Sequence, residues 1–194
     1  MKRMIIGVAL AGLGMFFWSA LAHTVLPIGG MGIKVLHDEE AFLGAVKTSA
    51  TEPGFYFFPG MDMSRKPSAE EQKAWTAKYE AGPCGIMVVH PHGRKAMNAS
   101  HLLTELGADL LAVGLAAWLV SPLAFGFWKR ALAVTLMGPI AWLSLSASYW
   151  NWYGFPTAYV TAEAIDQVVG WFIAGLVLSA IARTGESPGQ RLAS

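Results

Sequence analysis

Residues 4–26 read MIIGVALAGLGMFFWSALAHTVL, and this stretch decides the class of fold. Its 23 residues include no Asp, Glu, Lys or Arg, and about 20 apolar residues in a helix cross the core of a bilayer. No water is available there to satisfy backbone groups, so the segment must be helical. Three more predominantly apolar segments of about this length follow within residues 101–183, at about 103–121, 131–150 and 164–182. The sequence therefore predicts a membrane α-helical fold, a bundle of four transmembrane helices.

Charged residues are distributed unevenly along the chain. They make up 14% of the 194 residues, against about 25% in an average soluble domain. Residues 101–182 carry six charges, whereas residues 28–100 carry sixteen, eight of each sign. We therefore expect residues 28–100 to form a small extracytoplasmic domain between the first two spans. The net charge of +1 gives no electrostatic basis for binding nucleic acid.

Lysine and arginine flank the predicted spans on one side. With four spans, three short flanks share that side: Lys2 and Arg3, Lys129 and Arg130, and Arg183 and Arg191. The remaining short loop, residues 151–161, contains neither residue type. Because short cytoplasmic loops are rich in Lys and Arg, we expect both termini in the cytoplasm of a bacterium and residues 28–100 in the periplasm. The protein would then lie in the inner membrane, with residues 184–194 as a polar cytoplasmic tail.

The first span has a second interpretation. A basic start, an apolar core and the run Ala20-Leu21-Ala22 are typical of a secretory signal peptide. Cleavage after Ala22 would expose His23 as the N-terminus, where its amine and ring together would chelate copper. Apolar residues continue past Ala22 through Val25 and Leu26, so we expect residues 1–27 to be an uncleaved transmembrane anchor.

The extracytoplasmic segment has the pattern of a folded α/β domain with the order helix, strand, helix, strand. Asp38 is placed to cap a helix that ends near Thr48, and Ser68 with Glu71 forms a capping box before a helix at about 69–80. The strands are expected at 54–58 and 85–90. A helical crossover between them favours parallel pairing. Because about 70 residues bury little surface, we expect this domain to pack on the bundle, on a second copy or on a partner.

Histidines concentrate in and around this segment. His90 and His92 lie two residues apart, and two imidazoles at that spacing face one metal ion when the chain is extended. A copper or zinc site would take further ligands from Cys84, His37 or His101. The same residues, with a proline and glycine between and after them, are also typical of a plain turn after a strand. No other cofactor is predicted.

Acidic residues mark the extracytoplasmic ends of two spans. His101, Glu105 and Asp109 recur every fourth residue, so they share one helix face. Glu163 and Asp166 open the fourth span on the same side. Acids are stabilised near helix N-termini by the helix dipole, which is the structural interpretation. An acid inside a membrane is otherwise a candidate for binding or proton relay.

The loop after the third span is aromatic. Its rings are Tyr149, Trp150, Trp152, Tyr153 and Phe155. Such rings favour the level of the lipid headgroups, so anchoring in lipid is the simple interpretation. A quinone or lipid site is the alternative. Within the third span, Gly138-Pro139 predicts a kink.

The run PGFYFFPG at residues 53–60, with Ala81-Gly82-Pro83 further on, resembles the middle of some uncharacterised small bacterial inner-membrane proteins. Those proteins combine an anchor, a G-x-Y-x-x-P strand and later spans. The resemblance implies the same membrane architecture and carries no activity with it.

Motifs for phosphate-binding loops, metalloproteases, haem attachment and serine hydrolases are absent from the sequence. The first functional hypothesis is therefore a non-enzymatic accessory, assembly or complex-subunit protein that contacts membrane lipids. It would act as a homo-oligomer or in a larger membrane complex. The alternatives are a periplasm-facing metal-binding protein that uses His90 and His92, and a lipid- or quinone-handling membrane protein.

Overall fold

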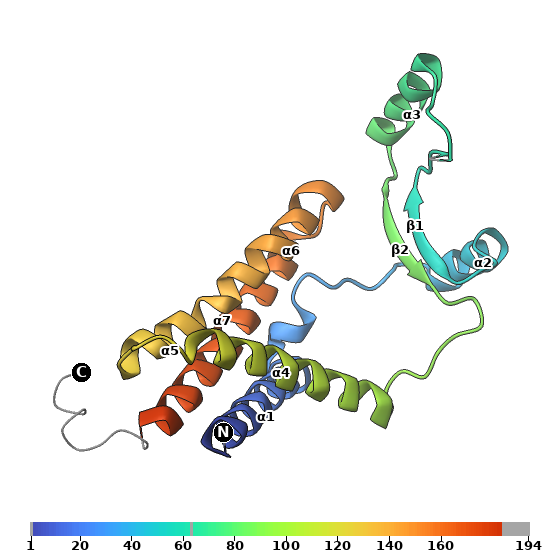
Figure 1. Cartoon of the computed structure of the whole chain (residues 1–194). Coiled ribbons are helices and arrows are strands. Elements are labelled where there is room, and N and C mark those ends of the chain that lie inside the picture. Colours follow the sequence, from blue (N-terminus) through green and yellow to red (C-terminus); the bar gives the residue numbers. More distant parts are fainter. Residues whose placement is uncertain (1, 63, 184–194) are drawn as a thin grey trace. The chain divides into compact units, whose positions relative to one another are not determined.

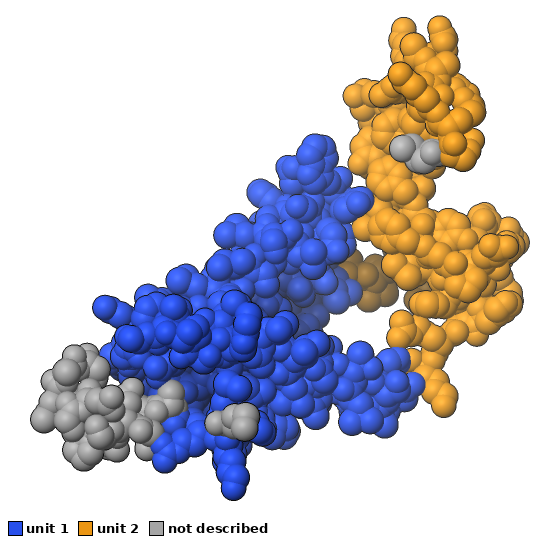
Figure 2. All heavy atoms as spheres, in the orientation of Figure 1, with its two compact units in different colours: residues 1–33, 97–194 blue, residues 34–96 orange. Residues whose placement is uncertain are grey.

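The computed structural model describes residues 2–62 and 64–183, which form two compact units (Figures 1 and 2). Unit 1 comprises residues 1–33 and 97–194, and unit 2 comprises residues 34–96. Unit 2 lies within residues 28–100, the segment predicted as a separate domain. The predicted cytoplasmic tail, residues 184–194, lies outside the described residues.

Unit 1 is helical. Its elements are α1 (Lys2–Thr24), the 3-10 helix η1 (Pro27–Gly30), α4 (Ala99–Val120), α5 (Phe127–Thr135), α6 (Met137–Tyr153) and α7 (Thr157–Arg183). Four helical stretches are long and apolar enough to cross a membrane: Lys2–Thr24, Ala99–Val120, Phe127–Tyr153 and Thr157–Ile181. They overlap the four apolar segments found in the sequence and support a membrane location for the protein.

The core of unit 1 is built around α7, which packs against α1, α5 and α6, while α1 also packs against α4 (Figure 1). The side chains of Ala11, Val113, Val134 and Ala174 are completely buried in it. These residues are small because membrane helices gain little from burying large apolar surfaces and associate through close backbone packing instead. The helices of this core therefore pack closely against one another.

Two glycines show how closely α7 approaches its neighbours. A Cβ atom at Gly175 on α7 would lie 2.5 Å from the carbonyl oxygen of Ala131 on α5. A Cβ atom at Gly138 on α6 would lie 2.5 Å from the carbonyl oxygen of Gln167 on α7. Any side chain at either position would collide with backbone, so glycine is required there.

The third apolar stretch is interrupted at Leu136, which ends α5 and precedes α6. The kink expected at Gly138-Pro139 thus takes the form of a helix break just before these residues. Pro139 falls in the first turn of α6, where a backbone N–H has no intrahelical acceptor and its absence costs nothing.

Both acid-bearing spans begin earlier than the apolar runs indicate. α4 starts at Ala99, where the Asn98 side chain caps it by accepting a hydrogen bond of 3.0 Å from the backbone N–H of His101. α7 starts at Thr157, directly after Pro156. Proline favours the start of a helix because its φ angle is already helical.

Unit 2 contains α2 (Glu39–Ser49), β1 (Gly54–Phe58), α3 (Ala69–Ala81) and β2 (Gly85–Val89). This confirms the predicted order of helix, strand, helix and strand. The expected parallel pairing is wrong, because β1 and β2 are antiparallel, with Gly54 opposite Val89 and Phe58 opposite Gly85. The connection through α3 leaves and returns at the same end of the sheet, so it is not a crossover.

Local side-chain contacts hold unit 2 together. The capping box of Ser68 and Glu71 at the start of α3 is confirmed. The ring of Phe57 on β1 stacks on Tyr79 with 5.9 Å between centroids, and Trp75 stacks on Tyr79 at 5.1 Å. The Trp75 Nε1 also donates a hydrogen bond of 2.8 Å to the carbonyl oxygen of Pro59. These contacts fix α3 against β1.

Candidate functional site

Three carboxylates and one imidazole gather in unit 1 at the end where α1 finishes and α7 begins. We call Asp109 on α4, Glu163 and Asp166 on α7, and His23 on α1 the acid cluster. Asp166 interacts electrostatically with both Asp109 and Glu163, and His23 interacts with Glu163. The packing of α1 against α4 and α7 brings these residues together.

Asp166 is the most closely held member of the acid cluster. Its Oδ2 lies 3.8 Å from the Nε2 of His23, an ion pair when the imidazole is protonated. The side chain of Asp166 is only 17% exposed, against 45% for His23. The Trp18 Nε1 donates a hydrogen bond of 3.2 Å to the backbone carbonyl oxygen of Asp166. Two residues of α1 thus position this turn of α7.

Glu163 borders a small cavity. The Tyr159 hydroxyl donates a hydrogen bond to the Glu163 carboxylate. A cavity of about 160 Å³ lies beside this pair. Its walls comprise His23, Ile28, Gly29, Ile33, Tyr159, Ala162 and Glu163. The acid cluster is therefore reachable by a small group from outside the helices.

Two carboxylate oxygens in the acid cluster are buried without a hydrogen-bond partner among the described residues. They are the Oδ2 of Asp109 and the Oδ1 of Asp166. Burying a carboxylate without compensating partners is costly, and inside a membrane such a group marks a binding or relay site. These two atoms are the strongest sign of function in unit 1.

The helix dipole does not account for these acids. Neither α4 nor α7 has an acidic residue in its first turn. Asp109 follows the first residue of α4, Ala99, by more than two turns, and Glu163 and Asp166 lie in the second and third turns of α7. Because stabilisation by the dipole fades beyond the first turn, the structural interpretation of these acids loses its support.

The remaining members of the predicted polar face lie at the margin of the acid cluster. His101 is in the first turn of α4, where its backbone N–H binds the Asn98 side chain. Glu105 is exposed and close enough to Asp109 to affect it electrostatically.

The predicted aromatic residues lie at the end of α6 and just after it. Tyr149, Trp150, Trp152 and Tyr153 are 39%, 50%, 74% and 41% exposed. Phe155 stacks on Tyr149 and contacts Tyr159, with both centroid separations 5.5 Å. Tyr159 in turn binds Glu163, so the aromatic group is continuous with the acid cluster. Its exposed rings suit the lipid headgroup level, as the sequence predicts.

The predicted metal ligands are dispersed in the described residues. His90 and His92 belong to a turn closed by a hydrogen bond of 2.8 Å from the Gly93 N–H to the His90 carbonyl oxygen. The extended chain on which the pairing of their imidazoles depended is therefore absent. Cys84 precedes β2 and His90 follows it, so an extended strand separates them by about 20 Å.

The other two predicted ligands lie in different parts of the chain. His37 precedes α2 in unit 2, whereas His101 belongs to unit 1. Over residues 2–62 and 64–183, no group of three His, Cys, Asp or Glu side chains is placed to hold a metal ion. Copper or zinc binding by His90 and His92 stays a prediction.

Sequence reasoning identified the three carboxylates of the acid cluster but missed three of their neighbours. Trp18, His23 and Tyr159 join them through packing of α1 on α7. The sequence pattern singles out His23 only as a possible new N-terminus. Its position as the only His of the first apolar stretch was an available signal, because an ionisable side chain in such a stretch usually has a partner.

Comparison of the chain with protein-family models, curated proteins and solved structures gave no match. Function therefore has to be inferred from the site itself.

Proposed function

We propose that this protein is a non-enzymatic subunit of a larger inner-membrane complex. In this proposal the acid cluster binds a lysine or arginine side chain from a membrane helix of another subunit. The observation that carries the proposal is the pair of buried carboxylate oxygens on Asp109 and Asp166 that have no hydrogen-bond partner within residues 2–62 and 64–183. A cation that donates several hydrogen bonds is the group these oxygens lack.

A partner side chain explains the acid cluster better than transport does. An ion or proton pathway needs polar groups along its whole length. The core that follows the acid cluster along the helices is packed from apolar side chains that include Ala11, Val113, Val134, Trp171 and Ala174. Among the described residues, the fully buried polar side chain in this region is that of Ser179, near the other end of α7. The acids are thus confined to one end of the bundle, which suits docking.

The distribution of charge supports the proposed topology. Arg3 at the start of α1 and Arg130 in α5 line a common cavity, so these basic residues share one end of unit 1. The acid cluster occupies the other end of α1. With the basic end in the cytoplasm, both termini are cytoplasmic and unit 2 is periplasmic.

Unit 2 supports a role in assembly. Among the described residues of unit 2, only Ala50, Pro59 and Val89 are buried. Val35, Phe55 and Val88 are 89%, 59% and 68% exposed. A two-stranded sheet with so little core is marginal alone, so unit 2 offers apolar surface to the same complex.

The test is purification of the tagged full-length protein from native membranes in mild detergent. We expect wild type to migrate in a complex larger than itself, and Asp109→Asn and Asp166→Asn to release it. Glu105→Gln is the matched control, because Glu105 is on the same helix face but exposed. A wild-type protein without partners, or variants that keep the complex, would contradict the proposal.

A charge swap makes the test specific for the contact. A photocrosslinker placed beside Asp109 identifies the helix of the partner subunit. The basic residue of that helix is then changed to Asp, and Asp109 is changed to Lys. Each single variant should lose the complex and the double variant should recover it. Failure of the double variant, with both proteins still inserted in the membrane, counts against direct pairing.

A further inference from the structure

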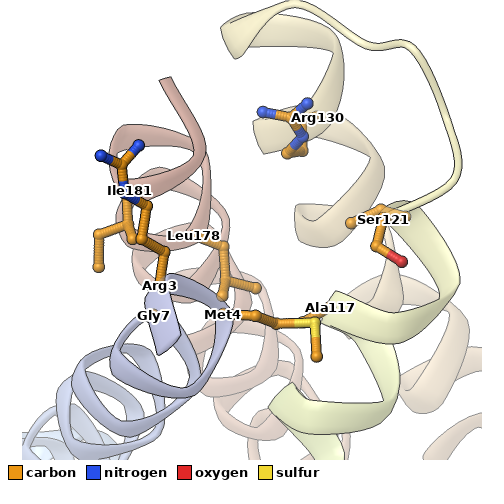
Figure 3. Close-up of a pocket in the computed structure, with 9 residues that line it drawn as sticks. Arg3, Met4, Gly7, Ala117, Ser121, Arg130, Leu178 and Ile181 are labelled. Atoms are coloured by element: carbon orange, nitrogen blue, oxygen red, sulfur yellow. The ribbon is translucent and has the colours of Figure 1, made fainter. Parts of the chain in front are cut away.

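A second site lies at the opposite end of unit 1 from the acid cluster. It is a cavity of about 260 Å³ between α1, α4, α5 and α7, and we call it the arginine cavity. Its lining residues are Arg3, Met4, Gly7, Ala117, Val120, Ser121, Arg130, Leu178 and Ile181. In Figure 3, Arg3 and Arg130 lie on opposite sides of this space, with Leu178 and Met4 along its lower edge.

Arg130 is held in place but incompletely bonded. Its Nη2 donates a hydrogen bond of 2.8 Å to the carbonyl oxygen of Phe125, which fixes the guanidinium. Its Nη1 is buried and has no partner among the described residues. A buried donor on a charged group is costly to leave unpaired, and a fixed guanidinium is suited to two parallel hydrogen bonds with an oxyanion. An anion bound in the cavity at Arg130 would supply the missing hydrogen-bond acceptor.

The rest of the wall restricts the kind of anion. Met4, Ala117 and Leu178 supply apolar atoms, and Ser121 adds one hydroxyl group. A small hydrated anion would lose water against these side chains without compensation. A phosphate that carries hydrocarbon would place its oxygens at the arginines and its chains along the apolar wall. The two kinds of surface together fit an anionic amphiphile.

We propose that the arginine cavity binds the phosphate of an anionic phospholipid from the inner leaflet. Arg130 donates to the phosphate oxygens, Arg3 adds a second positive charge, and the acyl chains lie against Met4 and Leu178. Basic pockets between membrane helices on the cytoplasmic side have this chemistry for lipid headgroups. The inference does not depend on the acid cluster, which lies at the other end of the bundle.

The test is to titrate the purified full-length protein in detergent with phosphatidylglycerol and to measure the Tm of the protein at each lipid concentration. Phosphatidylcholine and inorganic phosphate are the comparison ligands. We expect phosphatidylglycerol alone to raise the Tm substantially. An equal rise with phosphatidylcholine, which lacks net charge, would overturn the need for an anion. An equal rise with inorganic phosphate would overturn the lipid as its source.

Lys129 provides a matched control, because it is adjacent to Arg130 and exposed but does not line the cavity. Removing a surface cation weakens binding to anionic lipid by about fivefold. Lys129→Gln should lower the affinity for phosphatidylglycerol by about this factor, whereas Arg130→Gln should lower that affinity more than about tenfold. Equal losses in the two variants would overturn the site and indicate general attraction.

Arg130→Lys guards against misfolding of the glutamine variant. It keeps the charge but loses the two-pronged geometry, so it should fold like wild type and still bind the lipid more weakly than Lys129→Gln does. Wild-type affinity in Arg130→Lys, in a protein with the wild-type elution volume, would contradict a guanidinium-specific contact.

Discussion

The Nε2 of His23 lies 3.8 Å from the Oδ2 of Asp166, and this pair connects the last turn of α1 to α7. The other oxygen of the same carboxylate, Oδ1, is buried and has no partner among the described residues. One carboxylate oxygen of Asp166 thus contributes to the packing of α1 on α7, while the other is available to bind a further group.

The carboxylate of Asp109 should destabilise the isolated protein. Its Oδ2 is buried and has no hydrogen-bond partner in the part of the chain that the structure describes, so Asp109→Asn removes an uncompensated charge while keeping the shape. We expect the Tm of the purified protein to rise by about 2–4 °C, which corresponds to about 1 kcal/mol. The exposed Glu105→Gln should leave the Tm unchanged. A fall in Tm for Asp109→Asn would show instead that the carboxylate stabilises the bundle.

Gly175 should tolerate no side chain. Gly175→Ala places a Cβ 2.5 Å from the Ala131 carbonyl oxygen, so α5 and α7 must separate. We expect a loss of about 1–3 kcal/mol in the free energy of unfolding, measured by denaturant titration in detergent. Gly107 on α4 has no atom near its added Cβ, so Gly107→Ala should be neutral or stabilising by up to about 1 kcal/mol. Similar effects of both substitutions would contradict the close approach.

The start of α3 should weaken in acid. Hydrogen bonds from Arg65 and from the backbone N–H of Ser68 lower the pKa of Glu71 from 4.5 to about 2. A lowered pKa in the folded state means that the contribution to stability is present above about pH 4.5 and disappears as the pH falls toward 2. Hydrogen exchange of α3 should therefore differ between wild type and Glu71→Gln at pH 6, and the difference should shrink toward pH 3.

Glu70 is the control for this measurement, since it shares the first turn of α3 and is also exposed. Glu70→Gln should leave the exchange of α3 close to that of wild type throughout the titration. If both variants change exchange equally, the effect belongs to helix charge in general and not to the contact with Arg65.

The single cysteine reports the topology directly. Cys84 is exposed in unit 2, so a membrane-impermeant maleimide should label it in spheroplasts without lysis. In a Cys84→Ser background, Asn151→Cys should label from the same side and Ser121→Cys only after lysis. Labelling of Ser121→Cys in intact spheroplasts would reverse the proposed orientation.

The sequence predicts the spans well because counting apolar residues tests one physical quantity, the width of the bilayer core. It predicts their ends less well. The fourth span was expected from residue 164, whereas α7 begins at Thr157. Residues 157–163 are helical because Pro156 sets the backbone geometry for a helix start. Hydropathy does not detect this effect. That difference moves Glu163 from a helix start into a helix interior and changes its meaning.

The acid cluster was only partly predictable. Asp109 and Asp166 stand out in any reading of the chain, since acids are rare in apolar segments. Their pairing with Trp18 and His23 depends on how α1 rotates against α7, and small residues such as Ala11 leave that rotation open in the sequence. The antiparallel order of β1 and β2 was missed for a related reason. A helix between two strands fixes the length of the connection but not the end to which it returns.

The hairpin of β1 and β2 has a practical consequence. Among the described residues each strand has a single neighbour in the sheet, so both are edge strands, and edge strands offer backbone N–H and C=O groups to a further strand. A soluble fragment that contains only residues 34–96 would present these groups together with the exposed rings and aliphatic side chains beside them. Self-association of that fragment in solution is the outcome to expect, and preparing it with the membrane helices attached avoids the problem.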